Sequence, residues 1–132
     1  MADTLTFDLV SPERLLISEE VTMVVVPGSE GDFGVMVGHT PVITTLRPGV
    51  VEVHPSSGDR QRIYVRGGFA ETTGDNLTIL AEEAINLADL DRAKLEQRLA
   101  NAREDIGLAR DDEERRAAEI NVAQLTNLIA AL

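Results

Sequence analysis

The feature that most constrains this chain of 132 residues is an abrupt change of composition near residue 87. All five prolines, nine of the ten glycines and all four aromatic residues precede it, whereas residues 88–132 hold ten alanines, no proline and one glycine. Proline and glycine mark turns and interrupt helices, while alanine has the highest helix propensity. The sequence therefore predicts two domains, a strand-built domain over residues 1–87 and a helical domain over residues 88–132.

Residues 1–87 show the two-residue alternation that is typical of half-buried strands. Leu5, Phe7 and Leu9 alternate with Thr6 and Asp8. Short strands are expected at 5–9, 21–27, 35–37, 41–46, 50–53, 63–65 and 77–80, with hairpin loops at 56–59 and 73–76. Many short strands at such spacing favour an antiparallel β-sandwich or a flattened barrel.

Residues 88–132 carry two apolar stripes with helical spacing. The stripes are formed by Leu95, Leu99, Ala102 and Ile106, and by Ala118, Val122, Leu125, Ile129 and Leu132. Asp89 can cap the first helix with its carboxylate, Gly107 is expected to end it, and Asp111 or Asp112 to begin the second. The pattern predicts an antiparallel two-helix hairpin. Because alanine buries little apolar area, we expect loose docking of this hairpin, as a conformational switch requires.

The charge and the absence of cysteine exclude several classes of function. The chain has 12 basic and 23 acidic side chains, a net charge of −11, which opposes binding to nucleic acid or anionic lipid. Without cysteine, the sequence holds neither disulfides nor thiolate metal sites. No run reaches the ~18 apolar residues that a membrane-spanning helix needs, so direct membrane insertion is not expected.

No arrangement of catalytic or metal-binding residues stands out in the sequence. The two histidines, His39 and His54, do not have the spacing of a zinc site, which gathers three or four ligands. No serine has the partners of a nucleophile–base pair, and the glycine-rich stretch 27–34 lacks the lysine of a phosphate loop. The sequence predicts a non-enzyme without catalytic residues, metal or cofactor, and a small hydrolase has no supporting residue set.

The densest motif is PGSEGDFGVMVGHTP at residues 27–41, followed by LRPG at 46–49 and VRGGF at 65–69. In this order and spacing the three motifs closely resemble the epsilon subunit family of F-type ATP synthases, over essentially the whole chain. The resemblance implies an N-terminal antiparallel β-sandwich of about ten strands, a C-terminal helical hairpin and no catalysis by the chain itself. It also implies a place at the foot of the rotating central stalk, bound to the gamma subunit and to polar loops of the c-ring.

The resemblance assigns the c-ring-facing edge to the loop that carries Glu30, Gly31, Asp32 and Phe33, with His39 near it. Loops on such a ring present basic and polar groups, so an acidic tip suits them electrostatically. The alternative is that these are ordinary solvated turn residues. One face of the sandwich is expected to be apolar toward gamma, but the sequence does not say which strands supply it.

Some family members bind ATP as a regulatory ligand at the head of the first helix, and this chain matches their motif in part. Asp89, Arg92 and Ala93 match, whereas Ala88 replaces a larger aliphatic residue and the next basic residue lies one position closer. One residue turns a helix by ~100°, so that basic group would point elsewhere. The competing interpretation is that Asp89 caps the helix and Arg92 pairs with Glu96 at i,i+4.

In many bacterial members the hairpin can extend into the catalytic head and block ATP hydrolysis, which implies contacts with the alpha and beta subunits. Arg110, Arg115 and Arg116 could reach acidic patches there. Against this, the acids at 111–114 lower the local positive potential, and Arg115 can pair with Glu119 instead. Both possibilities, an inhibitory and a non-inhibitory hairpin, stay open.

The start of the chain has neither the basic patch nor the apolar core of a signal peptide. Together with the resemblance, this favours a peripheral place on the cytoplasmic side of a bacterial inner membrane, with a plastid-encoded member as the alternative. Two other functions stay open beside coupling: a brake formed by the hairpin, and a free-standing acidic sandwich that binds an unrelated protein.

Overall fold

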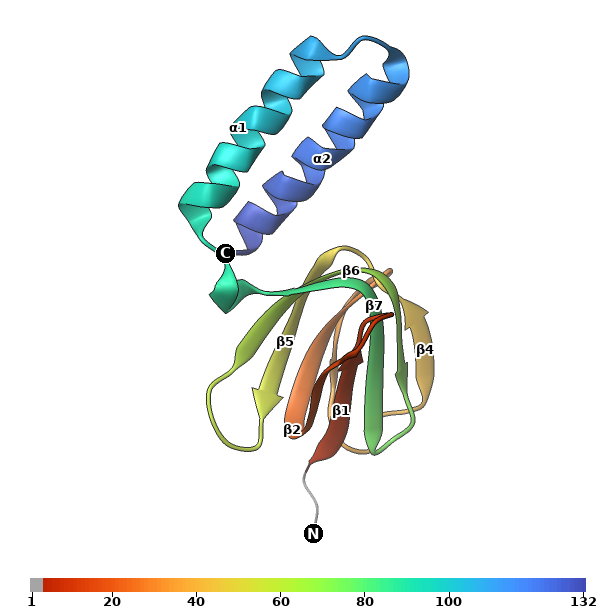
Figure 1. Cartoon of the computed structure of the whole chain (residues 1–132). Helices are drawn as coiled ribbons and strands as arrows, with labels where there is room; N and C mark the ends of the chain where they lie inside the picture. Colours follow the sequence, from red (N-terminus) through yellow and green to blue (C-terminus); the bar gives the residue numbers. More distant parts are fainter. Residues whose placement is uncertain (1–3) are drawn as a thin grey trace. The chain divides into compact units, whose positions relative to one another are not determined.

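The computed structural model describes residues 4–132 and divides into two compact units (Figure 1). The first unit ends at Ala88 and is built from strands, and the second runs from Asp89 to Leu132 and is built from helices. Each unit buries its own set of apolar side chains. No helix within residues 4–132 is long and apolar enough to cross a membrane.

The strand unit closes on itself in the manner of a barrel. Its strands, within the described residues, are β1 (Leu5–Val10), β2 (Leu15–Gly28), β3 (Gly31–Val35), β4 (Val42–Thr45), β5 (Gly49–Pro55), β6 (Gln61–Thr72) and β7 (Asn76–Asn86). They pair in the order β1-β7-β6-β5-β2-β3, β4 pairs with β6, and β1 also pairs with β2. The strands β1, β2, β5, β6 and β7 therefore form a closed circuit, and β3 and β4 are appended to it.

One pairing corrects the expectation of an antiparallel sheet. β1 and β7 run parallel, whereas the other four pairings of the circuit are antiparallel. The circuit has five strands, and a ring with an odd number of strands cannot alternate direction at every step. Closure of the sheet therefore requires one parallel pair.

The number and limits of the strands also differ from expectation. Residues 4–132 form seven strands and not about ten, because β2 and β6 are long enough to pair with three partners each. The strand predicted at 35–37 lies instead at Gly31–Val35. Gly28 pairs with Gly31, so Ser29 and Glu30 form a two-residue turn, and the φ of +137° at Gly31 is accessible to glycine alone.

The core consists of alternate residues along the strands, as the two-residue period predicts. Phe7, Val24, Val53 and Ile79 are completely buried, and all belong to one apolar cluster. Gly68 lies where β6 passes closest to β7. At its φ of +98°, a Cβ would lie 1.8 Å from the carbonyl oxygen of Leu80, so only glycine fits.

The first helix begins two residues later than the sequence suggests. Residues Leu87–Asp89 form a short 3-10 turn, η1, and α1 covers Arg92–Leu108. The cap is Asp91, whose carboxylate accepts from the backbone N–H groups of Ala93 at 2.9 Å and Lys94 at 3.4 Å. The prediction of Asp89 as cap was wrong because η1 holds Asp89 three residues before the first helical residue.

The second helix of the hairpin is α2, which covers Asp112–Ala131. Asp111 caps it by accepting from the N–H of Glu114 at 2.7 Å, as one of the two predicted starts requires. Gly107 does not end α1, which continues to Leu108 and is followed by Ala109. The seam contains the buried side chains of Leu95, Ala102 and Leu128, and the other predicted stripe residues are partly buried beside them.

Candidate functional site

Four of the predicted residues, Glu30 to Phe33, lie where β2 turns into β3, and His39 lies beyond the far end of β3, at the opposite end of one groove. We call Glu30, Gly31, Asp32, Phe33 and His39 the rim. The turn before them is tight, since a Cβ at Gly28 would lie 2.9 Å from both the carbonyl oxygen of Gly31 and Cε1 of Phe33. Ser29 donates its N–H to the carbonyl oxygen of Thr45 at 2.9 Å, which anchors the turn against β4. The rim is therefore held by backbone contacts from both sides.

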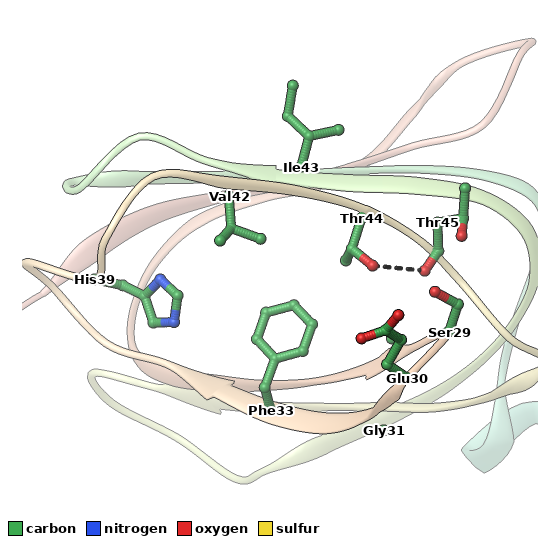
Figure 2. A pocket seen from close by; sticks show the side chains of 10 residues that line it. Ser29, Glu30, Gly31, Phe33, His39, Val42, Ile43, Thr44 and Thr45 are labelled. Carbon is green, nitrogen blue, oxygen red and sulfur yellow. Dashed lines mark hydrogen bonds between the residues drawn. The ribbon is translucent and has the colours of Figure 1, made fainter.

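A groove of about 580 Å³ lies between β3 and β4 and contains three rim side chains, Glu30, Phe33 and His39 (Figure 2). Phe33 and Val42 point into it from opposite strands, and His39 lies at one end. The ring centroids of Phe33 and His39 are 6.0 Å apart, and Nδ1 of His39 lies 2.7 Å from the carbonyl oxygen of Thr40. The groove thus has an apolar middle and polar ends.

The two acids of the rim have different surroundings. Asp32 is paired with the guanidinium of Arg47, whose backbone N–H donates to the carbonyl oxygen of Pro27 at 3.0 Å. Glu30 has no ion-pair partner within residues 4–132 and its side chain is exposed. Because exposed ion pairs contribute only ~0–1 kcal/mol, the Arg47 contact positions the loop more than it stabilises the fold. Glu30 is the uncompensated charge of the rim.

This arrangement suits recognition of a partner surface. A free carboxylate, hydroxyl groups of Ser29 and Thr44, and an aromatic ring next to Val42 surround one open groove. The hydroxyl of Thr44 donates to the carbonyl oxygen of Thr45 at 3.1 Å, so it is already engaged. A cationic side chain with an apolar stem would find both an opposite charge and an apolar wall here.

The residues predicted for nucleotide binding surround the start of α1. Arg92 lies 3.9 Å from Glu96, so the competing i,i+4 pair is present, with both side chains more than half exposed. The N–H of Ala93 is used by the Asp91 cap, and Asp89 lies in η1. The rim belongs to the strand unit and these residues to the region where the helical unit begins.

The three arginines considered for inhibition lie at the hairpin connection and the first turns of α2. The backbone N–H of Arg110 donates to Oε2 of Glu114 at 2.8 Å. Arg115 and Arg116 are exposed, and the predicted pair of Arg115 with Glu119 is not formed in the described part of the chain. Their guanidinium groups carry no ion pair within residues 4–132.

Sequence reasoning missed part of the groove. Val42, Ile43 and Thr44 complete it. Arg47 lies outside the groove lining and pairs with Asp32, although the LRPG motif had already drawn attention to residues 46–49. The missing information was the pairing of β4 with β6 instead of β3, a non-local contact that leaves the space between β3 and β4 open. Nothing in the local pattern distinguishes a β4 that pairs with β3 from one that does not.

Comparison with known proteins gives matches over almost the entire sequence. Residues 4–87 match the family described as ATP synthase, Delta/Epsilon chain, beta-sandwich domain, and residues 91–132 match the C-terminal domain of the ATP synthase epsilon chain. An ATP synthase epsilon chain of Parvibaculum lavamentivorans is 57% identical over 118 residues, 89% of each chain. One of Mesorhizobium japonicum is 49% identical over 132 residues, 100% of this chain and 98% of the relative.

Solved structures give the same result. A chain in the structure of the Euglena gracilis mitochondrial ATP synthase, with OSCP, F1 and c-ring, superposes with a TM-score of 0.83 at 28% identity. The match covers 99% of this chain and 82% of that one. A chain in the central stalk and c-ring structure of the Tetrahymena thermophila enzyme has a TM-score of 0.61 at 12% identity, which supports the fold alone.

Proposed function

This chain belongs to the family of ATP synthase epsilon chains, and from that membership we propose that it is the non-catalytic rotor subunit that joins the c-ring to gamma. Its partners would be the gamma subunit and the polar loops of the c-ring. Rotation of the ring would thereby reach the catalytic head. The chain performs no chemistry in this function and acts as a mechanical connection.

The observation that carries the proposal is the rim with its groove at one end of a closed strand unit. The uncompensated carboxylate of Glu30 suits basic loops, and the groove adds an apolar wall at Phe33 and a polar end at His39. The five-strand circuit supports the mechanical part, because a sheet without two open ends resists shearing between its strands. A connection that transmits torque needs such stiffness.

We assign the connecting role to the β-sandwich domain, residues 1–87, and the helical hairpin domain, residues 88–132, to a second role. The sandwich would place the subunit as a peripheral component on the cytoplasmic side of a bacterial inner membrane. Relatives of bacterial origin at about half identity over nearly the full length support the bacterial location.

Reconstitution tests the coupling function. ATP synthase assembled in vesicles without this chain should fail to make ATP from a proton gradient, and addition of the purified chain should restore synthesis. Synthesis at an unchanged rate without the chain would contradict the proposal. Hydrolysis of ATP by the catalytic head, measured in parallel, shows whether the head itself is intact.

A second candidate function is regulation by the hairpin, and the thin seam between its helices favours it. Within the helical unit, only Leu95, Ala102 and Leu128 are buried among the described residues that form α1 and α2. Few apolar side chains hold the two helices together, and helices in proteins are stabilised mostly by tertiary packing, so such a hairpin rearranges at low cost. In an extended position, Arg110, Arg115 and Arg116 would face the alpha and beta subunits.

Deletion of residues 88–132 tests the brake. The truncated chain should still assemble, and the ATP hydrolysis rate of the complex should rise. An unchanged rate would remove the brake and leave the coupling function intact. Calorimetric titration of the full chain with ATP tests whether Asp89, Arg92 and Ala93 hold the nucleotide, and heat of binding that vanishes in Arg92→Gln is the expected sign of such a site.

A further inference from the structure

The first residues of β2 have a free edge. β1 pairs with β2 from its start to Val21, but β5 reaches along the other side of β2 only as far as Val21, where Pro55 is the partner. The backbone N–H of Ser56 ends this contact by donating to the carbonyl oxygen of Glu20 at 3.4 Å. Within the described part of the chain, no strand pairs with residues 15–19 on that side.

Ser18 presents its backbone groups to this free edge. The N–H of Thr6 donates to the carbonyl oxygen of Asp75, on the β7 side of β1. Successive residues of a strand direct their backbone groups to opposite sides, so Phe7 bonds toward β2, where its partner is Glu19. Ser18, the neighbour of Glu19, therefore directs its N–H and carbonyl group away from β1. Unpaired groups of this kind are a template for another strand.

Glu19 stands on the core-facing side of the same edge. Its partner Phe7 is completely buried, and directly paired residues of neighbouring strands lie on one face. The residues two positions before and after it, Ile17 and Val21, pack against the core cluster or belong to it. Oε1 of Glu19 is buried and has no hydrogen-bond partner within residues 4–132. A carboxylate thus interrupts an otherwise apolar row.

A buried carboxylate oxygen without a partner costs stability, so its position needs a reason. β2 begins with three consecutive apolar residues, Leu15, Leu16 and Ile17, and Leu15 is 56% exposed. An apolar edge of this kind readily pairs with another edge, and inward-pointing charges are one of the features by which proteins prevent it. The free edge of β4 has other protection, since that strand is four residues long and follows Pro41.

We propose that Glu19 prevents two copies of this chain from joining through the free edge of β2. In an antiparallel pair of these edges centred on Ser18, Glu19 of each copy would lie opposite Ile17 of the other. The two carboxylates would be diagonal neighbours on the core-facing side, ~7–8 Å apart. Two like charges that lose water without gaining a partner oppose such a pair. This role is independent of the proposed function.

Self-association of the purified full-length chain tests this role. Equilibrium sedimentation gives the dissociation constant of a dimer, and the unmodified chain should be a monomer. Glu19→Val should dimerise with a constant about tenfold or more below that of the unmodified chain, because the pair no longer encloses two unpaired charges. Glu20→Val is the matched control. It removes the same charge from the next residue, which is exposed, and should sediment as the unmodified chain does.

A second substitution tests whether the edge itself forms the contact. Proline has no N–H, and the N–H of Ser18 points away from β1, so Ser18→Pro removes a donor only from the free edge. The double variant Glu19→Val with Ser18→Pro should return to a monomer. Glu19→Gln, which removes the charge and keeps a polar group, should dimerise more weakly than Glu19→Val but more strongly than the unmodified chain.

Several results would overturn the role of Glu19. A folded Glu19→Val variant that stays monomeric, a dimer of the unmodified chain, or equal dimerisation of Glu20→Val would each do so. So would a Glu19→Val dimer that Ser18→Pro leaves intact, since the contact would then lie elsewhere. Circular dichroism spectra and unfolding midpoints show which variants are folded, and Glu19→Gln decides by the same criteria if Glu19→Val does not fold.

Discussion

At the scale of single residues, Glu30 and Asp32 differ in what surrounds them although they stand two positions apart. Arg47 compensates Asp32, while Glu30 presents a free carboxylate. Reversal of that charge in Glu30→Lys would place like charges together against basic ring loops, which costs several kcal/mol at a contact. We predict a loss of ATP-driven proton pumping on the order of tenfold.

The control for this prediction is Glu13→Lys, which makes the same change at an exposed acid in the turn between β1 and β2. Pumping is followed by the fluorescence of a pH-sensitive dye in reconstituted vesicles. Equal pumping by the two variants would show that Glu30 is only a solvated turn residue.

Gly68 is the backbone position with the least space. A methyl group there would overlap the carbonyl of Leu80, and the φ of +98° disfavours any other residue. We expect Gly68→Ala to lower the free energy of unfolding of the strand unit by more than about 2 kcal/mol, measured by urea denaturation. In Gly34→Ala the nearest atom would be Sδ of Met23 at 3.5 Å, an ordinary contact, so that variant should keep the unmodified midpoint.

The Tyr64 hydroxyl makes stability depend on alkaline pH. It is buried and has no hydrogen-bond partner among residues 4–132. Burial raises the pKa of Tyr64 above its ordinary value of 10.0, Arg66 lowers this pKa and Glu83 raises it. Because the unfolded chain loses this proton first, the stabilisation is fully present below pH 10 and is lost as pH rises through the folded pKa. Tyr64→Phe should therefore show a flatter decline of the unfolding midpoint above pH 10, and an identical decline would contradict this assignment.

At the scale of elements, the cap of α1 separates two neighbouring acids. The carboxylate of Asp91 holds two N–H groups of the first turn, whereas Asp89 lies in η1. Asp91→Ala should destabilise the helix by about 1 kcal/mol, the usual cost of losing a cap. Asp89→Ala should cost much less. The readout is amide hydrogen exchange over residues 92–96, and equal acceleration in both variants would contradict the observed cap.

Patterns of neighbouring residues predict the elements whose formation depends mainly on those neighbours. The alternation of Leu5, Phe7 and Leu9 predicted β1, and the seam residues Leu95 and Ala102 are buried as their spacing indicated. The length of β2 and β6 was not predictable in this way, since both strands continue through changes of partner. Partner choice depends on contacts between residues far apart in the chain, which a single sequence does not contain.

The candidate site, too, was predictable where it depends on nearby residues and not where it depends on strand pairing. Residues 30–33 were predicted as a loop from a glycine- and proline-rich motif, but Gly31, Asp32 and Phe33 begin β3 and only Ser29 and Glu30 form the turn, which the Gly28–Gly31 pair closes. The groove beside it depends on where β4 lies, and this position is set by the pairing of β4 with β6. The surroundings of a residue such as Ile43 can be described only once its neighbours across the sheet are known.

At the scale of the whole molecule, the proposed function depends on a closed circuit of five strands that carries the rim. Glu30 of the rim lies at the Gly28–Gly31 end of β2, and the β5–β6 loop follows Pro55, which pairs with Val21 in the middle of that strand. A unit that joins two rotor components, as we propose for this one, needs a separate surface for each, and the rim is the surface that we propose for the ring. The hairpin is a second unit with its own caps and seam.

Cross-linking in the assembled complex measures most directly whether the rim faces the ring. The protein has no cysteine, so Glu30→Cys and Ser57→Cys each introduce one unique thiol, the second in the β5–β6 loop. Each thiol carries a short photoactivatable reagent, and the linked partner is identified by mass. The account predicts that the thiol at position 30 labels the ring subunit and the thiol at position 57 does not. Labelling of the ring from position 57 but not from position 30 would contradict it.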